Sequence, residues 1–513
     1  MADQPPFIHF QSNVTWQNKH QNVTRQVARL YDAWNLWADG SRPETDAWRA
    51  GLSALRQIIQ GAKALNRRVR PLGGGWSLSE AAATNDFLVN TKPLNFIKIG
   101  LQPIHCVPAM QQSAGQLVFA QCGASILELN QTLEAANLSL KTSGASNGQT
   151  IAGALSTGTH GAANQIGAMQ ECILGLHVLA DDGAAYWIER ASSPVVTDAF
   201  CDFLGARPLR DDNLFRAAVV SFGTFGLIHA VLLEVEPIFL LERYIRRFEY
   251  DDVLAAISSL DVGSLGLPQG RTLPFHFEVV INPYGTSKGK QGAYVRAMYK
   301  RPFKAIPSQP SPVVVTGPGD DVLGFAGALG EIAPFAIPSA VGHLLDAEMK
   351  PVEGSLGTHG QTFGTTTLRG PVMCMELGVP LKTVGAAVDA IVEVAGKKPF
   401  SGVIALRYVK ASDALLGFTR FKDTTCTIEL PSSLSSRTAD AFDNVCEALH
   451  TGGLPYTLHW GQCLPLPYTV ERVRETFGDD VDRWLTARRG FLTSPAARRM
   501  FANVVAERCG LAD

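Results

Sequence analysis

The chain has 513 residues, with 45 Lys or Arg against 47 Asp or Glu and a formal net charge of −2. At 46% hydrophobic and 18% charged residues, it is too apolar for intrinsic disorder. The chain is longer than one ordinary hydrophobic core can accommodate, so we expect two or more domains. The balance of positive and negative charges argues against a nucleic-acid partner.

The N-terminal segment and the cysteines point to a reducing compartment. Residues 1–16 have no basic region followed by an apolar run, so we expect no secretory signal. The nine Cys are irregularly spaced and include no C-x-x-C pair, which is typical of reduced thiols. We therefore expect a cytoplasmic protein, and the absence of a paired Cys/His cluster predicts no metal site.

The first half of the chain predicts alternating helices and strands. Residues 48–65 predict an amphipathic helix, because Leu52, Leu55 and Ile58 fall on one face. Further predicted elements are a short strand from Val69, strands at 87–89 and 117–119, a helix at 124–138, a hairpin over 172–189 and a strand at 226–236. Pro237 ends the last strand, so we expect the first domain boundary there.

The second half has the pattern of an α+β fold. Strand-like runs at 275–281, 372–379 and 403–409 alternate with helical segments such as 381–395. This order suits an antiparallel sheet with helices on one side, and helices are expected again over 469–509.

An apolar segment at 322–345 is interrupted by Glu331, Pro334 and Pro338. The interruptions argue against a transmembrane helix and against stable membrane insertion. Two short buried helices are favoured. The alternatives are an apolar lid over a substrate entrance and a surface patch that touches a membrane or a partner.

Two glycine-rich loops are the strongest functional signal. In the first, Gly73, Gly74 and Gly75 can direct several backbone N–H groups to one point, as an anion-binding nest for a pyrophosphate requires. In the second, residues 149–161, small side chains let the backbone lie against a flat ligand while Ser and Thr hydroxyls donate hydrogen bonds. Together the loops favour a nucleotide cofactor.

These loops resemble the flavin domain of the vanillyl-alcohol oxidase and p-cresol methylhydroxylase superfamily. Residues 149–153 and 157–161 are close to the family form, and residues 221–228 resemble the end of the module. His459-Trp460-Gly461-Gln462 resembles the His-Trp-Gly-Lys motif of the sugar-lactone and alditol oxidase branch, and the bacterial cholesterol oxidases of covalent type are a second similar branch.

The resemblance implies an α+β fold with a two-subdomain FAD-binding domain over residues 1–237, a cap domain over 238–455 and a C-terminal return over 456–513. It implies an FAD-dependent oxidoreductase, in the form of an oxidase that takes a hydride from a CH–OH or CH–NH carbon of a small molecule, with O2 as acceptor. The expected FAD contacts are Pro71, Gly73, Gly74, Gly75, Trp76, Ser77, Ser146, Thr150, Gly153, Thr157, Gly158, His160, Gly161, Gly226 and Ile228.

The sequence departs from the family at three places. Many members bond a first-loop His covalently to the flavin, but the two positions where it could fall are Gly74 and Trp76, so we expect non-covalent FAD. In the cap, Arg407 is kept while Ala405 replaces the usual Glu, and Gln462 replaces the usual Lys. These changes disfavour a polyol or aldonolactone and favour a bulkier, more apolar substrate.

The predicted catalytic residues are Glu278, Glu376, Arg407, His459 and Gln462. Glu278 and Glu376 each lie between apolar residues on a predicted cap strand, and a carboxylate that faces a cavity there should have a raised pKa. The alternative is that each faces solvent or pairs with an arginine. His459 is equally compatible with a structural and a catalytic role.

Other functions stay open. Gly144 to Gly148 matches the G-x-S-x-G pattern, so a serine hydrolase with Ser146 as nucleophile is a rival, although the flanking residues do not predict the required strand and helix. A flavin dehydrogenase with another acceptor, and a flavin-fold protein that only binds a ligand, are further alternatives. A homo-oligomer is also compatible with the sequence.

Overall fold

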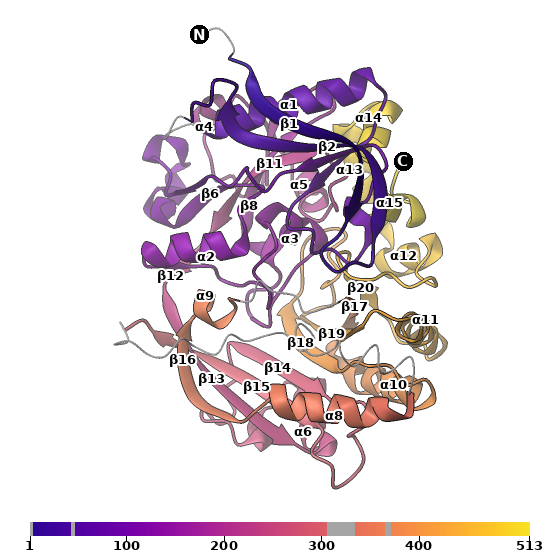
Figure 1. The fold of residues 1–513 in the computed structure, drawn as a ribbon. Helices are drawn as coiled ribbons and strands as arrows, with labels where there is room; N and C mark the ends of the chain where they lie inside the picture. The colour runs from indigo at the N-terminus through magenta and orange to yellow at the C-terminus, as the bar shows by residue number, and fades with distance from the viewer. Residues whose placement is uncertain (1–3, 43–46, 305–333, 365–370) are drawn as a thin grey trace.

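The computed structural model describes residues 4–42, 47–304, 334–364 and 371–513. Strands from the N-terminal part and helices from the C-terminus occupy one half of the molecule, and the middle of the chain occupies the other (Figure 1). The mixture of helices and sheets confirms the α+β prediction.

A four-stranded mixed sheet has the order β1-β2-β4-β3. Its strands are β1 (Pro6–Gln17), β2 (Thr24–Trp37), β4 (Phe87–Asn90) and β3 (Val69–Leu72). β1 and β2 are antiparallel, whereas β2, β4 and β3 run parallel. The sequence predicted β3 and β4 but not β1, because most side chains of β1 are exposed and give no alternating apolar pattern.

A six-stranded sheet lies behind the first one and has the order β10-β9-β8-β11-β6-β5. Its strands are β10 (Arg207–Arg210), β9 (Ala185–Glu189), β8 (Ile173–Leu179), β11 (Leu227–Glu234), β6 (Leu117–Gln121) and β5 (Ile97–Ile99). β8 and β9 pair antiparallel, which confirms the predicted hairpin.

Helix α1 (Trp48–Ala64) joins these two sheets. Its buried residues Leu52, Leu55 and Ile59 share one apolar cluster with Val89 of β4 and Phe119 of β6. The apolar face predicted for α1 therefore packs against both sheets. The other helices of this half are α2 (Ile126–Ala135), α3 (Ile151–Thr157), α4 (Asp198–Leu204) and α5 (Asp212–Ala218).

The middle of the chain forms an eight-stranded sheet in which every pair of neighbours is antiparallel. Its strands in order are β16 (Val352–Thr358), β13 (Phe239–Phe248), β15 (Ala293–Pro302), β14 (His276–Ile281), β18 (Ile404–Lys410), β19 (Thr424–Ser433), β17 (Val372–Pro380) and β20 (Thr457–Leu458).

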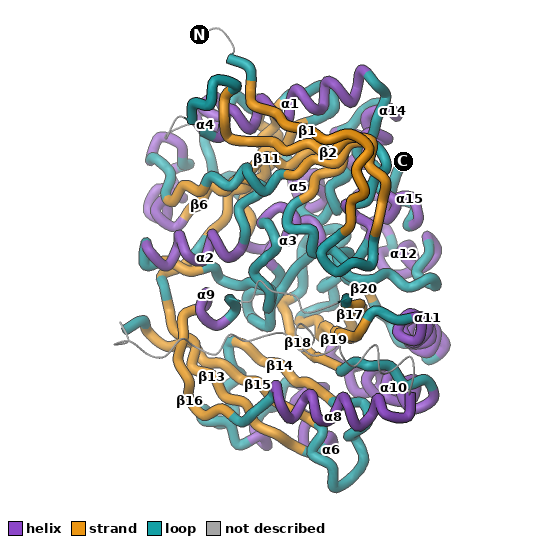
Figure 2. Tube along the Cα trace, in the orientation of Figure 1, coloured by secondary structure: helices purple, strands orange, loops and turns teal. Residues whose placement is uncertain are grey.

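Helices cover both faces of this sheet, not one as expected (Figure 2). Residues of α6 (Tyr250–Ser259), α10 (Val384–Lys397) and α11 (Ser436–Thr451) share an apolar cluster with Phe277, Leu406 and Ile428. On the opposite face, α8 (Ile337–Glu348) packs on Val280 and Ala405. The rest of that face is turned to the N-terminal half and bears the charged residues described below.

The C-terminal helices pack against the N-terminal half. They are α12 (Val470–Phe477), α13 (Asp479–Phe491), α14 (Pro495–Met500) and α15 (Val504–Arg508). The Trp484 indole donates to the Ala217 carbonyl at 3.1 Å, and Arg488 donates to the Thr224 carbonyl at 3.1 Å. The helices expected after residue 469 are confirmed.

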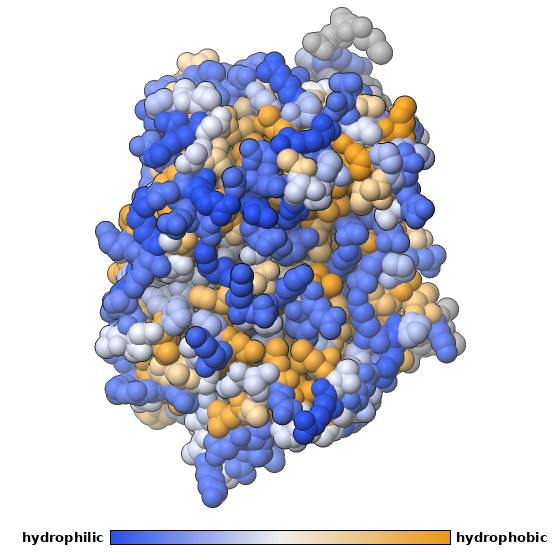
Figure 3. All heavy atoms as spheres, turned by 180° about the vertical axis from the view of Figure 1, so that it is seen from behind, coloured by the Kyte–Doolittle hydropathy of each residue, from blue (hydrophilic) through white to orange (hydrophobic). Residues whose placement is uncertain are grey.

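Part of the apolar segment 322–345 lies outside the described residues. From residue 337 it forms α8, with Pro338 in the first turn and only Ile337, Val341 and Leu345 buried. Within the described ranges, no helix is long and apolar enough to cross a membrane. The face seen from behind is mostly polar, with apolar atoms in scattered groups (Figure 3).

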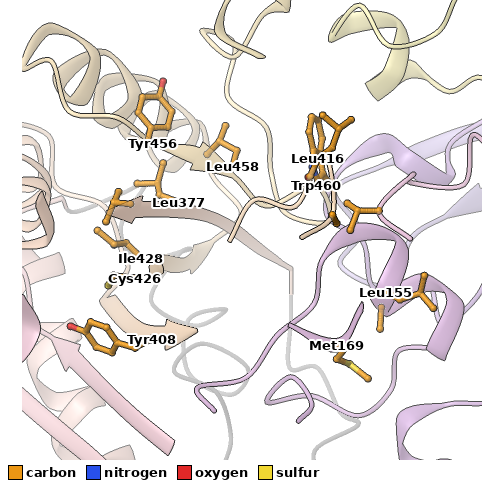
Figure 4. Close-up of a cluster of buried hydrophobic side chains, with 14 of the residues drawn as sticks. Leu155, Met169, Leu377, Tyr408, Leu416, Cys426, Ile428, Tyr456, Leu458 and Trp460 are labelled. Atoms are coloured by element: carbon orange, nitrogen blue, oxygen red, sulfur yellow. The ribbon is translucent and has the colours of Figure 1, made fainter. Parts of the chain in front are cut away.

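One apolar core runs from the N-terminal half into the large sheet. Leu155 and Met169 of the first half share this core with Leu377 and Ile428 of the sheet (Figure 4). Trp460 is fully buried in the same core and donates from its indole N–H to the Leu416 carbonyl at 2.7 Å. The two halves are thus held by a shared hydrophobic interior.

A buried histidine pair lies in the six-stranded sheet. The Nδ1 atoms of His177 and His229 are 3.0 Å apart, and His229 Nε2 contacts the Trp48 carbonyl at 3.2 Å. Burial lowers the pKa of both rings, that of His229 to about 3. Both rings are therefore neutral near neutral pH.

This pair should make stability depend on pH. Above about pH 6.5, histidine is neutral in both the folded and the unfolded chain. As the pH falls below that value, the unfolded chain binds protons that the folded chain cannot bind, so each buried His costs about 1.4 kcal/mol of unfolding free energy per pH unit. Urea unfolding between about pH 7 and pH 5 measures this slope.

The variant His177→Asn should reduce the slope. Equal slopes for wild type and His177→Asn would contradict the assignment.

Candidate functional site

The two glycine loops, 75 residues apart in sequence, pack directly on each other. A Cβ atom on Gly74 would overlap the Gly148 carbonyl oxygen, and one on Gly73 would overlap the Thr150 hydroxyl. A Cβ on Gly148 would overlap the Trp76 ring. Only glycine allows this approach, so the glycines bring the two loops to one place.

Both loops line one cavity. Among the residues expected to contact a cofactor, those in the cavity wall are Pro71, Gly73, Gly74, Gly75, Trp76, Ser77, Ser146, Thr150, Gly153, Thr157, His160, Gly226 and Ile228. Gly158 and Gly161 are not in the wall. Gly158 ends α3 with a φ of 87°, and Gly161 packs on the Ser143 carbonyl, so both shape the loop from behind.

The His459–Gln462 motif closes the same cavity. The backbone N–H of Leu78 donates to the Gly461 carbonyl at 2.8 Å, and the Ser79 hydroxyl donates to the Trp460 carbonyl at 2.6 Å. The Gly461 N–H donates to His459 Nδ1 at 2.9 Å. His459 therefore carries its own proton on Nε2, and burial lowers its pKa to about 4, so the ring is neutral.

The large sheet supplies the opposite wall. Of the predicted catalytic residues, Glu376, Arg407, His459 and Gln462 line the cavity, whereas Glu278 does not. Glu278 lies behind Arg407, with Arg407 Nε at 3.0 Å and Arg296 Nη1 at 2.5 Å. Burial raises the Glu278 pKa, but the two guanidinium groups outweigh burial and lower it.

Glu376 is paired with His160. His160 Nε2 lies 2.9 Å from Glu376 Oε1, while His160 Nδ1 lies 2.8 Å from the Gly161 carbonyl oxygen. Because a carbonyl only accepts, Nδ1 carries a proton, and Nε2 faces the Glu376 carboxylate. Burial raises the Glu376 pKa, but His160, His459 and Arg407 lower it to about 2.

The expected raised pKa is thus wrong for Glu376, which faces the cavity, whereas its condition is not met for Glu278, which lies outside the wall. Each carboxylate is buried beside cations, and the attraction of those cations exceeds the effect of burial. For Glu278 the alternative holds, because it pairs with arginines.

Sequence reasoning missed a third carboxylate. Glu429 lines the cavity, and its Oε2 lies 2.7 Å from Arg407 Nη2. Burial raises its pKa, an effect that Arg407 opposes and Glu376 strengthens. The signal was present, since Glu429 lies between Ile428 and Leu430 as the other two acids lie between apolar residues.

His20 was also missed and lines the end of the cavity near Trp76. Its ring meets the Trp76 ring edge-on, with centroids 5.7 Å apart. Burial lowers the His20 pKa to about 4. The residues around His20, from Asn18 to Asn22, are all polar, so the local sequence does not predict that His20 is buried.

The cavity is built for a polar ligand that comes close to the backbone. Two buried amide oxygens, Gln149 Oε1 and Gln462 Oε1, lie in its wall and have no hydrogen-bond partner among the described residues. Glycines of both loops lie in the same wall, where the absence of a side chain lets a ligand approach the backbone closely. These features fit a flat heterocycle that carries phosphate groups.

The hydrolase alternative lacks its structural context. A nucleophile elbow needs a strand directly before the serine and a helix directly after it. Ser146 lies in a segment without strand or helix between β7 (Leu138–Ser139) and α3. Ser146 instead lines the cavity with the glycine loops.

Comparisons with known proteins agree with this site. A family model described as "FAD binding domain" matches residues 51–189. A putative D-arabinono-1,4-lactone oxidase from Neurospora crassa is 31% identical over 201 residues, 39% of this chain and 31% of that protein. L-gulonolactone oxidase from Mus musculus is 23% identical over 205 residues, 40% of each chain. The chain thus spans only about a third of the length of the curated relatives that it matches.

The fold is similar along the whole chain to a solved structure of cholesterol oxidase from B. sterolicum. The TM-score is 0.70 at 13% identity, and the match covers 99% of this chain and 100% of that one. A likeness at this identity speaks for the fold only. Residues 51–189 thus match an FAD-binding domain, and the comparisons together support the assignment of the chain to the vanillyl-alcohol oxidase and p-cresol methylhydroxylase superfamily.

Proposed function

We propose that this protein is an FAD-dependent oxidoreductase that removes a hydride and a proton from a CH–OH or CH–NH carbon, with O2 as electron acceptor. One observation supports this most directly. A single cavity is lined by both glycine loops on one side and by Glu376, Arg407 and Glu429 of the large sheet on the other.

The proposed division of the chain follows from this cavity. Residues 1–237 and 456–513 form the FAD-binding domain, and residues 238–455 form the cap over the reacting end. The cytoplasmic location stays a prediction.

FAD would supply the hydride acceptor, and the chain's residues would bind and orient it. The glycines at 73–75 would hold the pyrophosphate through backbone N–H groups, and Thr150 and Thr157 would add hydroxyl contacts. Gly226 and Ile228 lie in the wall beside the adenine or ribose end of the proposed site. Gln462, in place of the usual Lys, offers a hydrogen bond but no charge.

A moderately apolar substrate fits the cap side of the cavity. Val372, Met373 and Pro431 lie in the wall beside the carboxylates. Arg407 offers little to an anionic substrate, since its guanidinium already contacts Glu278 and Glu429. We therefore favour neutral alcohols or amines over acids.

Anaerobic mixing with candidate donors tests the function. The FAD-loaded protein is mixed with sterols, aldonolactones, polyols, aryl alcohols and amines, and the flavin absorption band is followed. We expect at least one neutral donor to bleach the band, and admission of O2 to restore it. Bleaching without recovery in O2 would favour a dehydrogenase. No bleaching by any class would favour the ligand-binding alternative.

Acid precipitation tests the mode of attachment. Trp76 occupies a position at which a covalent His could fall, and its ring packs on Gly148, so we expect FAD in the supernatant and a colourless pellet. A yellow pellet would contradict non-covalent binding. The variant His20→Ala would then show whether the histidine at that end of the cavity is the attachment point.

The variant Gly74→Ala tests whether the contact between the two glycine loops, here called the glycine cradle, is needed to bind FAD. Its new methyl group must displace the Gly148 carbonyl, so we expect FAD affinity to fall about tenfold or more, measured by fluorescence titration of the apoprotein. Gly61→Ala is the matched control, because Gly61 lies in α1 with nothing within 4 Å of the added Cβ. Unchanged affinity in Gly74→Ala would contradict the cradle.

A further inference from the structure

One face of the cap sheet carries a row of charges from strand to strand. Arg296 of β15 lies opposite Glu278 of β14, and Glu278 lies opposite Arg407 of β18. Residues directly opposite in a sheet share a face. The contacts follow this row, since both arginines bind Glu278.

The row continues with two carboxylates that face each other. Glu429 of β19 lies directly opposite Glu376 of β17 and, on its other side, opposite Ala405 of β18. Like charges in this position repel each other unless a cation lies between them. Arg407 is that cation, with Nη2 at 2.7 Å from Glu429 and Nη1 at 3.9 Å from Glu376.

The two carboxylates differ in their remaining contacts. Glu376 has His160 on Oε1, and its side chain is 3% exposed. Among the residues that the structure describes, Glu429 receives on Oε1 only a weak donor, the Cys374 thiol at 3.4 Å, and its side chain is 15% exposed. Glu429 is therefore the more accessible carboxylate at the cavity.

Three other titratable groups near the cavity, Glu278, Glu376 and His459, are poorly arranged to accept a proton. Glu278 is held by two arginines outside the wall. Glu376 is in contact with His160, and its lowered pKa makes it a weak base. The Nδ1 lone pair of His459 is used by the Gly461 N–H, so that ring presents a donor at Nε2.

We propose that Glu429 is the catalytic residue that accepts the proton of the substrate hydroxyl or ammonium group. This inference rests on the proposed function and names its base. In the step, the substrate O–H or N–H proton would go to a Glu429 oxygen, and the carbon would lose a hydride with its electron pair, for which bound FAD would supply the acceptor. A C=O or C=N bond forms, and O2 later takes the two electrons.

The charges of the row support this assignment. With both carboxylates ionised, the charges of Arg296, Glu278, Arg407 and Glu429 sum to zero. When Glu429 becomes neutral, one positive charge on Arg407 is no longer matched. That charge faces the cavity at the moment when a hydride brings negative charge to the ring, and it would stabilise that charge. Burial, which raises the Glu429 pKa, makes this carboxylate a better base than an exposed one.

The variant Glu429→Gln keeps the size and an acceptor for Arg407 but removes the base. Benzyl alcohol, cholesterol, an aldonolactone and benzylamine serve as donors in anaerobic stopped flow. We expect flavin bleaching to slow by about 10²-fold or more, while FAD affinity and the flavin spectrum stay unchanged. In wild type the rate should fall as the pH drops through the Glu429 pKa, and this dependence should vanish in Glu429→Gln.

Two variants control this experiment. Glu429→Asp should regain part of the rate together with its pH dependence, as expected for a base but not for a structural acceptor. Glu393→Gln, an exposed carboxylate paired with Lys397, should behave as wild type. Wild-type rates and pH dependence in Glu429→Gln would overturn the proposal.

A second measurement needs no donor, so it separates this inference from the proposed function. Infrared titration of the FAD-loaded protein should show a protonated carboxyl band that titrates above the ordinary Glu range. The band should be absent in Glu429→Gln and present in Glu278→Gln. The band can behave in this way even if no donor bleaches the flavin. That result would contradict the proposed reaction and would still support Glu429 as the residue that holds the proton. A band unchanged in Glu429→Gln overturns the site.

Discussion

The buried guanidinium of Arg407 is the interaction on which the site depends. It contacts Glu278 at 3.0 Å and Glu429 at 2.7 Å, and it lies 3.9 Å from Glu376. Removing one partner of a buried ion pair typically costs about 3–5 kcal/mol, because the other charge stays buried without compensation. Arg407 permits three carboxylates on one sheet face and so allows an acidic wall in an otherwise apolar interior.

A second constraint acts on the wall formed by the two glycine loops, where glycines rather than charged side chains lie next to the ligand site. The contact of Gly73 and Gly74 with the loop at 148–150 allows no side chain between them. Backbone N–H groups, not lysines or arginines, are then available for a phosphate-bearing ligand. Arg70 is buried at this wall, but its guanidinium donates to the carbonyls of Ala81, Gly223 and Phe222, so it serves the fold. A near-zero net charge is compatible with such a site.

The two walls meet through His160 and His459. His160 belongs to the second glycine loop yet contacts Glu376 of the large sheet, and His459 lies between strand β20 of that sheet and the first glycine loop. The rings of His160 and His459 have centroids 6.1 Å apart. The histidines therefore couple the position of the acidic wall to the glycine cradle.

The elements with strong local patterns could be predicted from sequence. Helix α1 has apolar residues at helical spacing, and the β8–β9 hairpin has a turn with Gly183 between alternating strands. The long strand β1 could not, because most of its side chains are exposed and it is held by pairing with β2. The position of α8 on the charged face also depended on long-range packing.

The sequence by itself determined the two glycine loops, the acids flanked by apolar residues and the kinship of the chain, since these are properties of residue type and order. Only the tertiary structure decided which acid meets the cavity. Glu278, Glu376 and Glu429 have the same local pattern, but strand order sets Glu278 behind two arginines, gives Glu376 a histidine and leaves Glu429 at the wall. A carboxylate's proton affinity depends on its neighbours in space, and the strands that bring those neighbours lie far apart in the chain.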